Sequence, residues 1–161
     1  MRRLIIIFAA IVLISATVSA QTVQVTAKPL SDTDIQLLRS DVQSVKNQII
    51  ADTMQFTDAE SKVFWPVYRD YARDQQVIGD DRVRLITDYA KNYDSMDDPK
   101  AKDMVQRMIS IEERNLNVRK DYWPKFVNAL GAKRAAKFYQ VDNRISLIIN
   151  LQLTDEIPLI P

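Results

Sequence analysis

Apolar residues recur at helical spacing along most of the chain and predict four helices. Steps of three and four residues give each helix one apolar stripe, the pattern of a helix that faces a core. The expected helices cover residues 31–54, 57–93, 99–130 and 133–151. With only 2 glycines in 161 residues, the chain is poorly suited to a loop-rich or all-β fold. We therefore expect an all-α fold: an elongated, bent helical hairpin with flanking helices and an extended C-terminal tail.

The first expected helix carries a heptad-like seam of apolar residues. Its members are separated by steps of three, four, three and four, and they are Ile35, Leu38, Val42, Val45 and Ile49. Such a seam is typical of a helix face that packs against another helix. Ser31 and Asp34 have the spacing of a capping box at the start of this helix.

Two later helix starts carry capping signals. Thr57 and Glu60 have the spacing of a capping box. Asp98 followed by Pro99 has the pattern of an N-cap and a first helical residue. Proline is tolerated there because the N–H of the first helical residue has no partner within the helix. Gly79 lies in the middle of the second expected helix, where glycine costs about 1 kcal/mol relative to alanine and favours a bend.

A pentad of aromatic residue, tryptophan, proline, any residue and aromatic residue occurs twice. It occupies residues 64–68 in the second expected helix and residues 122–126 in the third. Each proline removes one backbone hydrogen bond, so bends are expected at Pro66 and Pro124. In an antiparallel hairpin that turns near residue 96, these two prolines lie almost level. The sequence therefore predicts that the aromatic side chains of both pentads meet across the hairpin.

The paired pentads have two interpretations. Aromatic side chains mostly serve burial, which favours a core cluster. Alternatively, bent helices form a concave surface on which some rings stay exposed and bind apolar segments of other proteins. The candidate contact residues are Phe64, Trp65, Tyr68, Tyr122, Trp123 and Phe126. Trp65 is turned away from the apolar stripe of its helix by about 100°, so it is expected outside the core, and Trp123 by analogy.

Basic residues concentrate at the end of the third expected helix and on the fourth. A solvated face explains such a patch, and the alternative is a shallow basic surface that attracts acidic or unfolded chains. The candidate contact residues here are Lys133, Arg134 and Lys137.

Residues 1–20 have the pattern of a secretory signal peptide. Arg2 and Arg3 precede an uncharged apolar run, shorter than the roughly 20 residues of a membrane-spanning helix, and the segment ends in VSA, which signal peptidase accepts. We expect residues 21–30 to be a flexible linker and residues 31–161 to be one helical domain. The mature protein is then periplasmic or secreted, meets a membrane only through the cleaved leader, and has no nucleic-acid partner.

The sequence contains neither histidine nor cysteine. Without them no Ser/His or Cys/His nucleophile pair can form, and a helical di-iron site loses its usual histidines. Met104 and Met108 are one helical turn apart, but core filling explains them better than Cu(I) binding. We therefore expect a protein that is not an enzyme, with no catalytic residue, no metal and no cofactor.

Two short segments lie where expected helices begin: residues 56–60 read FTDAE and residues 130–134 read LGAKR. They resemble the Leu-Thr-x-x-Gln motif that opens a helix and recurs in the periplasmic Spy/CpxP-like (LTxxQ) family. The first segment keeps the threonine and the second keeps the leucine. The chain resembles a divergent member of that family with a doubled aromatic-Trp-Pro motif. The resemblance implies a bent helical hairpin that forms a homodimeric cradle.

The resemblance leads to two hypotheses for function. The first is an ATP-independent chaperone, a holdase for unfolded or partly folded proteins in the envelope stress response. The alternative is a stress-sensing adaptor that binds one specific sensor protein of the envelope membrane. Many substoichiometric partners in an affinity pull-down would favour the holdase, and one stoichiometric partner would favour the adaptor.

Overall fold

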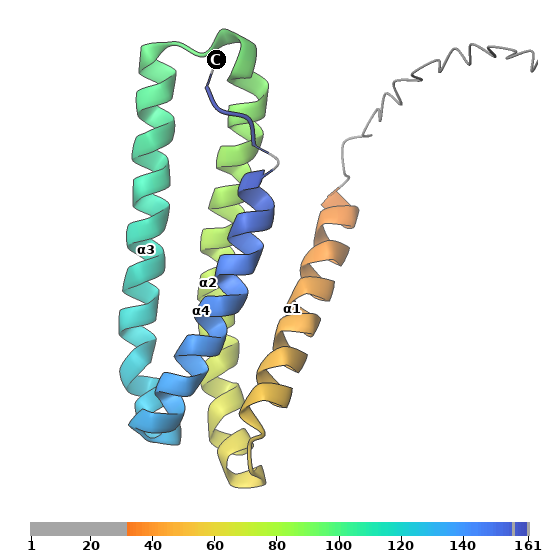
Figure 1. Cartoon of the computed structure of the whole chain (residues 1–161), viewed down its shortest axis with the longest axis vertical. Coiled ribbons are helices and arrows are strands. Elements are labelled where there is room, and N and C mark those ends of the chain that lie inside the picture. Colours follow the sequence, from red (N-terminus) through yellow and green to blue (C-terminus); the bar gives the residue numbers. More distant parts are fainter. Residues whose placement is uncertain (1–31, 156, 161) are drawn as a thin grey trace, which may run out of the picture.

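The computed structural model describes residues 32–155 and 157–160, and within them it is all-α (Figure 1). The elements are α1 (Asp32–Met54), α2 (Asp58–Asn92), the short 3₁₀ helix η1 (Tyr93–Ser95), α3 (Asp98–Leu130) and α4 (Ala132–Asp155). The predicted all-α fold with four long helices is confirmed for this part of the chain. The expected signal peptide (1–20), the expected linker (21–30) and the expected cap at Ser31 lie outside the described residues.

Helices α2 and α3 form the long antiparallel hairpin, with η1 at its turn (Figure 1). Contacts join the two helices along their length. Near the open end the rings of Phe64 and Phe126 have centroids 5.6 Å apart. Near the turn the guanidinium of Arg107 lies 2.8 Å from the carboxylate of Asp88. This register brings the two aromatic-Trp-Pro pentads together, as predicted.

The capping box at the start of α2 is confirmed. The backbone N–H of Glu60 donates to the Thr57 hydroxyl over 3.2 Å, and the Thr57 N–H donates to the Glu60 carboxylate over 2.9 Å. Two otherwise unpaired helix N–H groups are thereby satisfied. Helix α2 continues without interruption through Pro66 and Gly79 to Asn92.

The cap of α3 lies one residue earlier than predicted. The carboxylate of Asp97, not that of Asp98, accepts the backbone N–H of Lys100 over 3.0 Å. Pro99 then lies in the first helical turn, where its missing N–H still removes no hydrogen bond. Sequence alone could not separate the two aspartates, because either can cap a helix.

The seam predicted on α1 is not buried. Val42, Val45 and Ile49 are all exposed, so the expectation that they pack against another helix is wrong in this structure. The side chains of Ile35 and Leu38 lie outside the described part.

Helix α1 instead packs on α4 with a neighbouring face. Ile50 and Met54, near its C-terminal end, are fully buried in the core. Lys46 lies on the same side and reaches a carboxylate of α4. The docking face is therefore rotated from the apolar seam, because an ion pair and two buried residues fix α1 rather than a heptad pattern.

The core is an aromatic cluster between α2, α3 and α4, extended by the end of α1. Phe64 is 0% exposed, and its ring lies within 4.4–5.6 Å of five other rings. The buried members are Ile50, Met54, Phe64, Tyr68, Tyr71, Tyr122, Phe126, Ala135, Phe138, Val141 and Ile145. Trp123 does not join the rings of the first pentad as expected, and it lies edge-on to Tyr139 of α4 instead.

Helix α4 and the tail after it differ from prediction in extent and burial. The helix ends at Asp155 rather than near residue 151, and Ile148 in its C-terminal half is exposed. The tail contacts α2, where the Tyr89 hydroxyl donates to the Pro158 carbonyl over 2.7 Å. Leu159, however, is 89% exposed, so the tail covers α2 by a backbone contact more than by burying its apolar side chains.

The 2 glycines make a matched pair for testing backbone effects. At either position an added Cβ would meet nothing within 4 Å, so crowding contributes to neither substitution. Gly79 lies inside α2, and Gly79→Ala is expected to stabilise the fold by about 0.5–1 kcal/mol. Gly131 ends α3 with φ +76° and ψ 155°, a region that is essentially confined to glycine, and Gly131→Ala is expected to cost about 1–3 kcal/mol. Urea denaturation of both variants measures this, and changes of the same sign would contradict it.

Candidate functional site

The structure divides the candidate aromatic residues into two groups. Four of them fill the space between α2, α3 and α4 and are buried: Phe64, Tyr68, Tyr122 and Phe126. Because these rings pack in the core, they have almost no accessible surface in this conformation. Trp65 is half-buried at the edge of the cluster, and Trp123 is 40% exposed. Both tryptophans thus keep accessible surface.

Two of the candidate basic residues are engaged within the fold. Arg134 binds Glu60 with two hydrogen bonds of 2.8 Å each. Lys137 donates to the backbone carbonyl of Thr53, at the end of α1, over 2.7 Å. Lys133 is exposed. Two of the three candidate basic residues therefore also join α4 to α1 and α2.

The ion pair between Arg134 and Glu60 joins the two segments that resemble the family motif. Glu60 belongs to residues 56–60 and Arg134 to residues 130–134. The backbone N–H of Thr57, followed by the guanidinium of Arg134, holds the pKa of Glu60 below its ordinary value. The carboxylate therefore stays charged while it caps α2 and binds α4.

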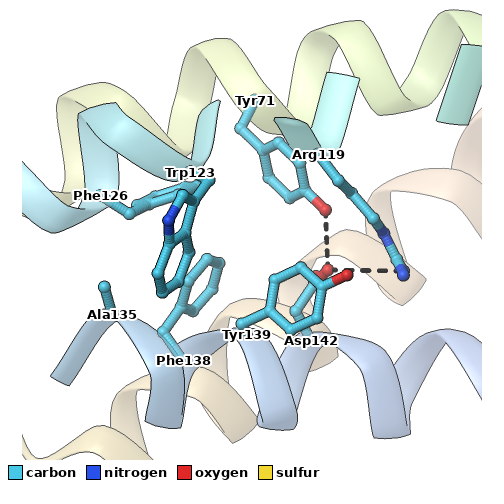
Figure 2. A pocket seen from close by; sticks show the side chains of 8 residues that line it. All are labelled: Tyr71, Arg119, Trp123, Phe126, Ala135, Phe138, Tyr139 and Asp142. Atoms are coloured by element: carbon cyan, nitrogen blue, oxygen red, sulfur yellow. Dashed lines mark hydrogen bonds and ion pairs between the residues drawn. The ribbon is translucent and has the colours of Figure 1, made fainter. Parts of the chain in front are cut away.

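A buried carboxylate links all four helices, and Figure 2 shows its contacts with Tyr71 and Arg119. Asp142 of α4 is only 2% exposed. It accepts a hydrogen bond of 2.7 Å from the Tyr71 hydroxyl of α2 and lies 2.7 Å from the ammonium of Lys46 of α1. The guanidinium of Arg119 of α3 lies 3.8 Å away. Burial raises the pKa of the Tyr71 hydroxyl above its ordinary value, with Asp142 acting in the same direction, so this group remains a donor.

The cavity beside this cluster is too small for a ligand. It lies between Arg119, Asp142 and a set of aromatic side chains that includes Trp123 and Tyr139 (Figure 2). Its volume is about 10 Å³, which is the space of a single water molecule at most. We assign the four residues Lys46, Tyr71, Arg119 and Asp142, named here the four-helix clasp, to stability rather than to binding.

Sequence reasoning missed the clasp, although one signal was present. Asp142 follows directly after Val141 on the apolar stripe that also contains Phe138 and Ile145. An acid on a buried stripe needs a partner, because an unpaired buried charge is strongly destabilising. The partners themselves come from three other helices and had no local signal.

A groove lies between α1 and α2, with a volume of about 430 Å³. It is lined by Gln43 and Asn47 from α1 and by Trp65, Tyr68, Arg69, Ala72, Arg73 and Gln76 from α2. Two residues of the predicted contact surface, Trp65 and Tyr68, thus belong to it. The arginines and carboxamides were not predicted. For the α2 residues of the groove, the sequence did contain a signal: residues 65, 69, 72, 73 and 76 are spaced so that they lie on one face of a helix.

Within the described residues, there is no group of three or more histidine, cysteine, aspartate or glutamate side chains that could hold a metal ion. Met104 is half-buried and Met108 is 43% exposed, so the expected core role fails for Met108.

None of the described helices is sufficiently long and apolar to span a membrane.

Comparison of the chain with protein-family models, with curated proteins and with solved structures gave no match. The resemblance to the Spy/CpxP-like family therefore stays an expectation that rests on residues 56–60 and 130–134.

Proposed function

We propose that the protein is a periplasmic or secreted, non-enzymatic binding protein that holds unfolded or partly folded polypeptides without ATP. The observation that supports this most strongly is the exposed apolar row on α1. Val42, Val45 and Ile49 are 41–56% exposed, and their spacing of three and four residues makes them neighbours on one helix face. Within the part of the chain that the structure describes, these side chains stay accessible, so they are available to the apolar segments of a client.

Other exposed apolar groups extend the surface that clients can use. Leu147, Ile148 and Leu151 are exposed on the C-terminal half of α4, and Trp123 is exposed on α3. Burying such groups contributes about 25 cal/mol per Å², and the ordering of client and side chains offsets much of this. Capture through these residues would therefore be weak and reversible, which suits a holdase.

The proposal is tested by light scattering from a client that aggregates when its disulfides are reduced, for example insulin. We expect the purified protein at several-fold molar excess to suppress scattering without ATP. The variant V42S/V45S/I49S removes the apolar row at exposed positions, and we expect it to lose at least half of the suppression while keeping its thermal stability.

The matched control is V63S/V105S, which changes two exposed valines on separate helices. It should suppress aggregation like the unmodified chain, because isolated apolar side chains do not form a contiguous patch. Absence of suppression by the unmodified protein at several-fold excess would overturn the holdase proposal. A single stoichiometric partner in a pull-down would then favour the adaptor.

A further inference from the structure

The four helices leave one side of their bundle open. Helix α2 packs on α3, α3 packs on α4, and α4 packs on α1. Helices α1 and α2 follow each other in the chain but lie further apart than these pairs, with side-chain contacts such as that of Gln43 with Tyr68 between them, and α1 diverges from α2 toward its N-terminal end (Figure 1). The groove of about 430 Å³ occupies this open side. A ligand could therefore bind there without separating any packed pair of helices.

The groove combines three carboxamides and two arginines with the apolar surface of Trp65, Tyr68 and Ala72. Gln43, Asn47 and Gln76 each present a carboxamide, which can both donate and accept hydrogen bonds. A peptide backbone offers the complementary N–H and C=O groups at every residue. The groove is therefore suited to an extended polypeptide that has no internal hydrogen bonds.

Part of the lining is already fixed in position. The Gln43 side-chain amide donates to the Asn47 carbonyl oxygen over 2.8 Å and also to the Tyr68 hydroxyl over 3.2 Å. Burial raises the pKa of Tyr68 well above its ordinary value, so its hydroxyl stays protonated. Such prearranged groups lower the ordering cost of binding a ligand.

The charge of the groove selects for an acidic ligand. Its lining contains two arginines and no acidic residue. The guanidinium of Arg73 forms ion pairs with the exposed carboxylates of Asp70 and Asp74, over 3.2 and 3.9 Å. Arg69 has no ion pair or hydrogen bond among the residues that the structure describes. Its guanidinium can thus take a carboxylate in a bidentate arrangement.

The length of the lining sets the length of the ligand. From Trp65 to Gln76 the α2 face extends over about 16 Å at 1.5 Å per residue. An extended chain of about five residues spans this distance at about 3.3 Å per residue. Trp65 at one end offers a half-buried indole ring to an apolar side chain.

We propose that the groove between α1 and α2 binds an extended polypeptide segment of about five residues in which acidic side chains alternate with apolar ones. The carboxylate binds Arg69, the carboxamides of Gln43, Asn47 and Gln76 bind the backbone, and Trp65 contacts an apolar side chain. Residues 21–30 of the chain itself, QTVQVTAKPL, contain a lysine and no acid, so they do not match this charge. The site rests on the proposed function only in taking a polypeptide as the ligand.

The chain offers a direct optical reporter, because it has only 2 tryptophans. In the Trp123→Phe variant, the tryptophan fluorescence comes only from Trp65, which lies in the groove. The probe is a capped pentapeptide, Leu-Glu-Leu-Glu-Leu, and the control peptide has lysine in place of glutamate. We expect saturable binding of the glutamate peptide, at least tenfold weaker binding of the lysine peptide, and loss of affinity as salt is added.

Arg69→Gln in the same background should weaken binding of the glutamate peptide about three- to tenfold, because the carboxylate loses its bidentate partner. The matched control is Arg144→Gln, which changes an exposed arginine on α4 outside the groove and should leave the affinity unchanged. The proposal is overturned if the glutamate peptide gives no saturable change, if both peptides bind equally, or if the two arginine variants behave alike.

This outcome is separable from that of the aggregation assay. Peptide binding that depends on Arg69, together with no suppression of aggregation, would retain the groove as a peptide site and remove the holdase proposal. Suppression of aggregation with no peptide binding would retain the holdase proposal and remove the groove as its site.

Discussion

Phe64→Ala is expected to lower the free energy of unfolding by about 3–5 kcal/mol, the largest effect of any single substitution considered. The side chain is 0% exposed, and its ring contacts five others from the α1–α2 loop, α2, α3 and α4. Alanine leaves a cavity among rings that cannot all move inward, so both transfer energy and packing are lost. Thermal unfolding should shift downward by roughly 10–20 °C.

The control for Phe64→Ala is Val63→Ala, which truncates an adjacent exposed side chain on the same helix. Its effect should stay within about 0.5 kcal/mol. Urea denaturation followed by circular dichroism measures both variants. If Phe64→Ala cost no more than the control, the aromatic cluster would not be the core of this fold.

Asp142→Ala is the second substitution with a large expected effect, a loss of about 2–4 kcal/mol. It leaves Lys46, Arg119 and the Tyr71 hydroxyl without their shared acceptor. Removing one partner of a buried ion pair costs about 3–5 kcal/mol, but the two cationic side chains are 14% and 15% exposed and can partly turn toward water. The measurement is again the free energy of unfolding in urea.

Two further variants test the prediction for Asp142→Ala. Asp142→Asn keeps the size of the side chain and an acceptor for Tyr71 but removes the charge, so its cost should lie between those of the unmodified chain and Asp142→Ala. Asp121→Ala removes an exposed aspartate from α3 and should be nearly neutral. A cost for Asp142→Ala as small as that of Asp121→Ala would show that the clasp contributes nothing to stability.

The hairpin could be predicted from sequence because its signals are local. The capping box of Thr57 and Glu60 fixes the start of α2. The repeated pentads give the register of α2 against α3, which the contact between Phe64 and Phe126 bears out. That these segments are helical follows from the spacing of apolar residues alone, because steps of three and four residues over a long segment indicate an α-helix.

The position of α1 could not be predicted in the same way. Its apolar seam suggested burial of Val42, Val45 and Ile49, whereas the docked face is held by Lys46 and by the buried Ile50. Which face of a helix docks depends on partners distant in the chain, and the partner of Lys46 is 96 residues away at Asp142. A single sequence contains no signal for that pairing.

The candidate site was predicted only in part, for a related reason. Trp65 and Tyr68 were identified by residue type, but Gln43, Asn47 and Arg69 are ordinary surface residues until α1 and α2 are placed side by side. The aromatic rings of the pentads show the opposite case, in which the residue type suggested a binding surface but the side chain is buried. Phe126 and Tyr122 satisfy the chemistry of a binding surface, yet Phe126 packs against Phe138 of α4 and Tyr122 against Tyr71 of α2, so both are buried.

The sharing of one carboxylate among four helices has a consequence for cooperativity. Helix α1 cannot detach without removing Lys46 from Asp142, and displacing α2 or α3 removes Tyr71 or Arg119 from the same group. Local opening of any one helix therefore weakens the attachment of the other three. The bundle should melt in a single, all-or-none transition, even though its open side would otherwise let the first helix fray on its own.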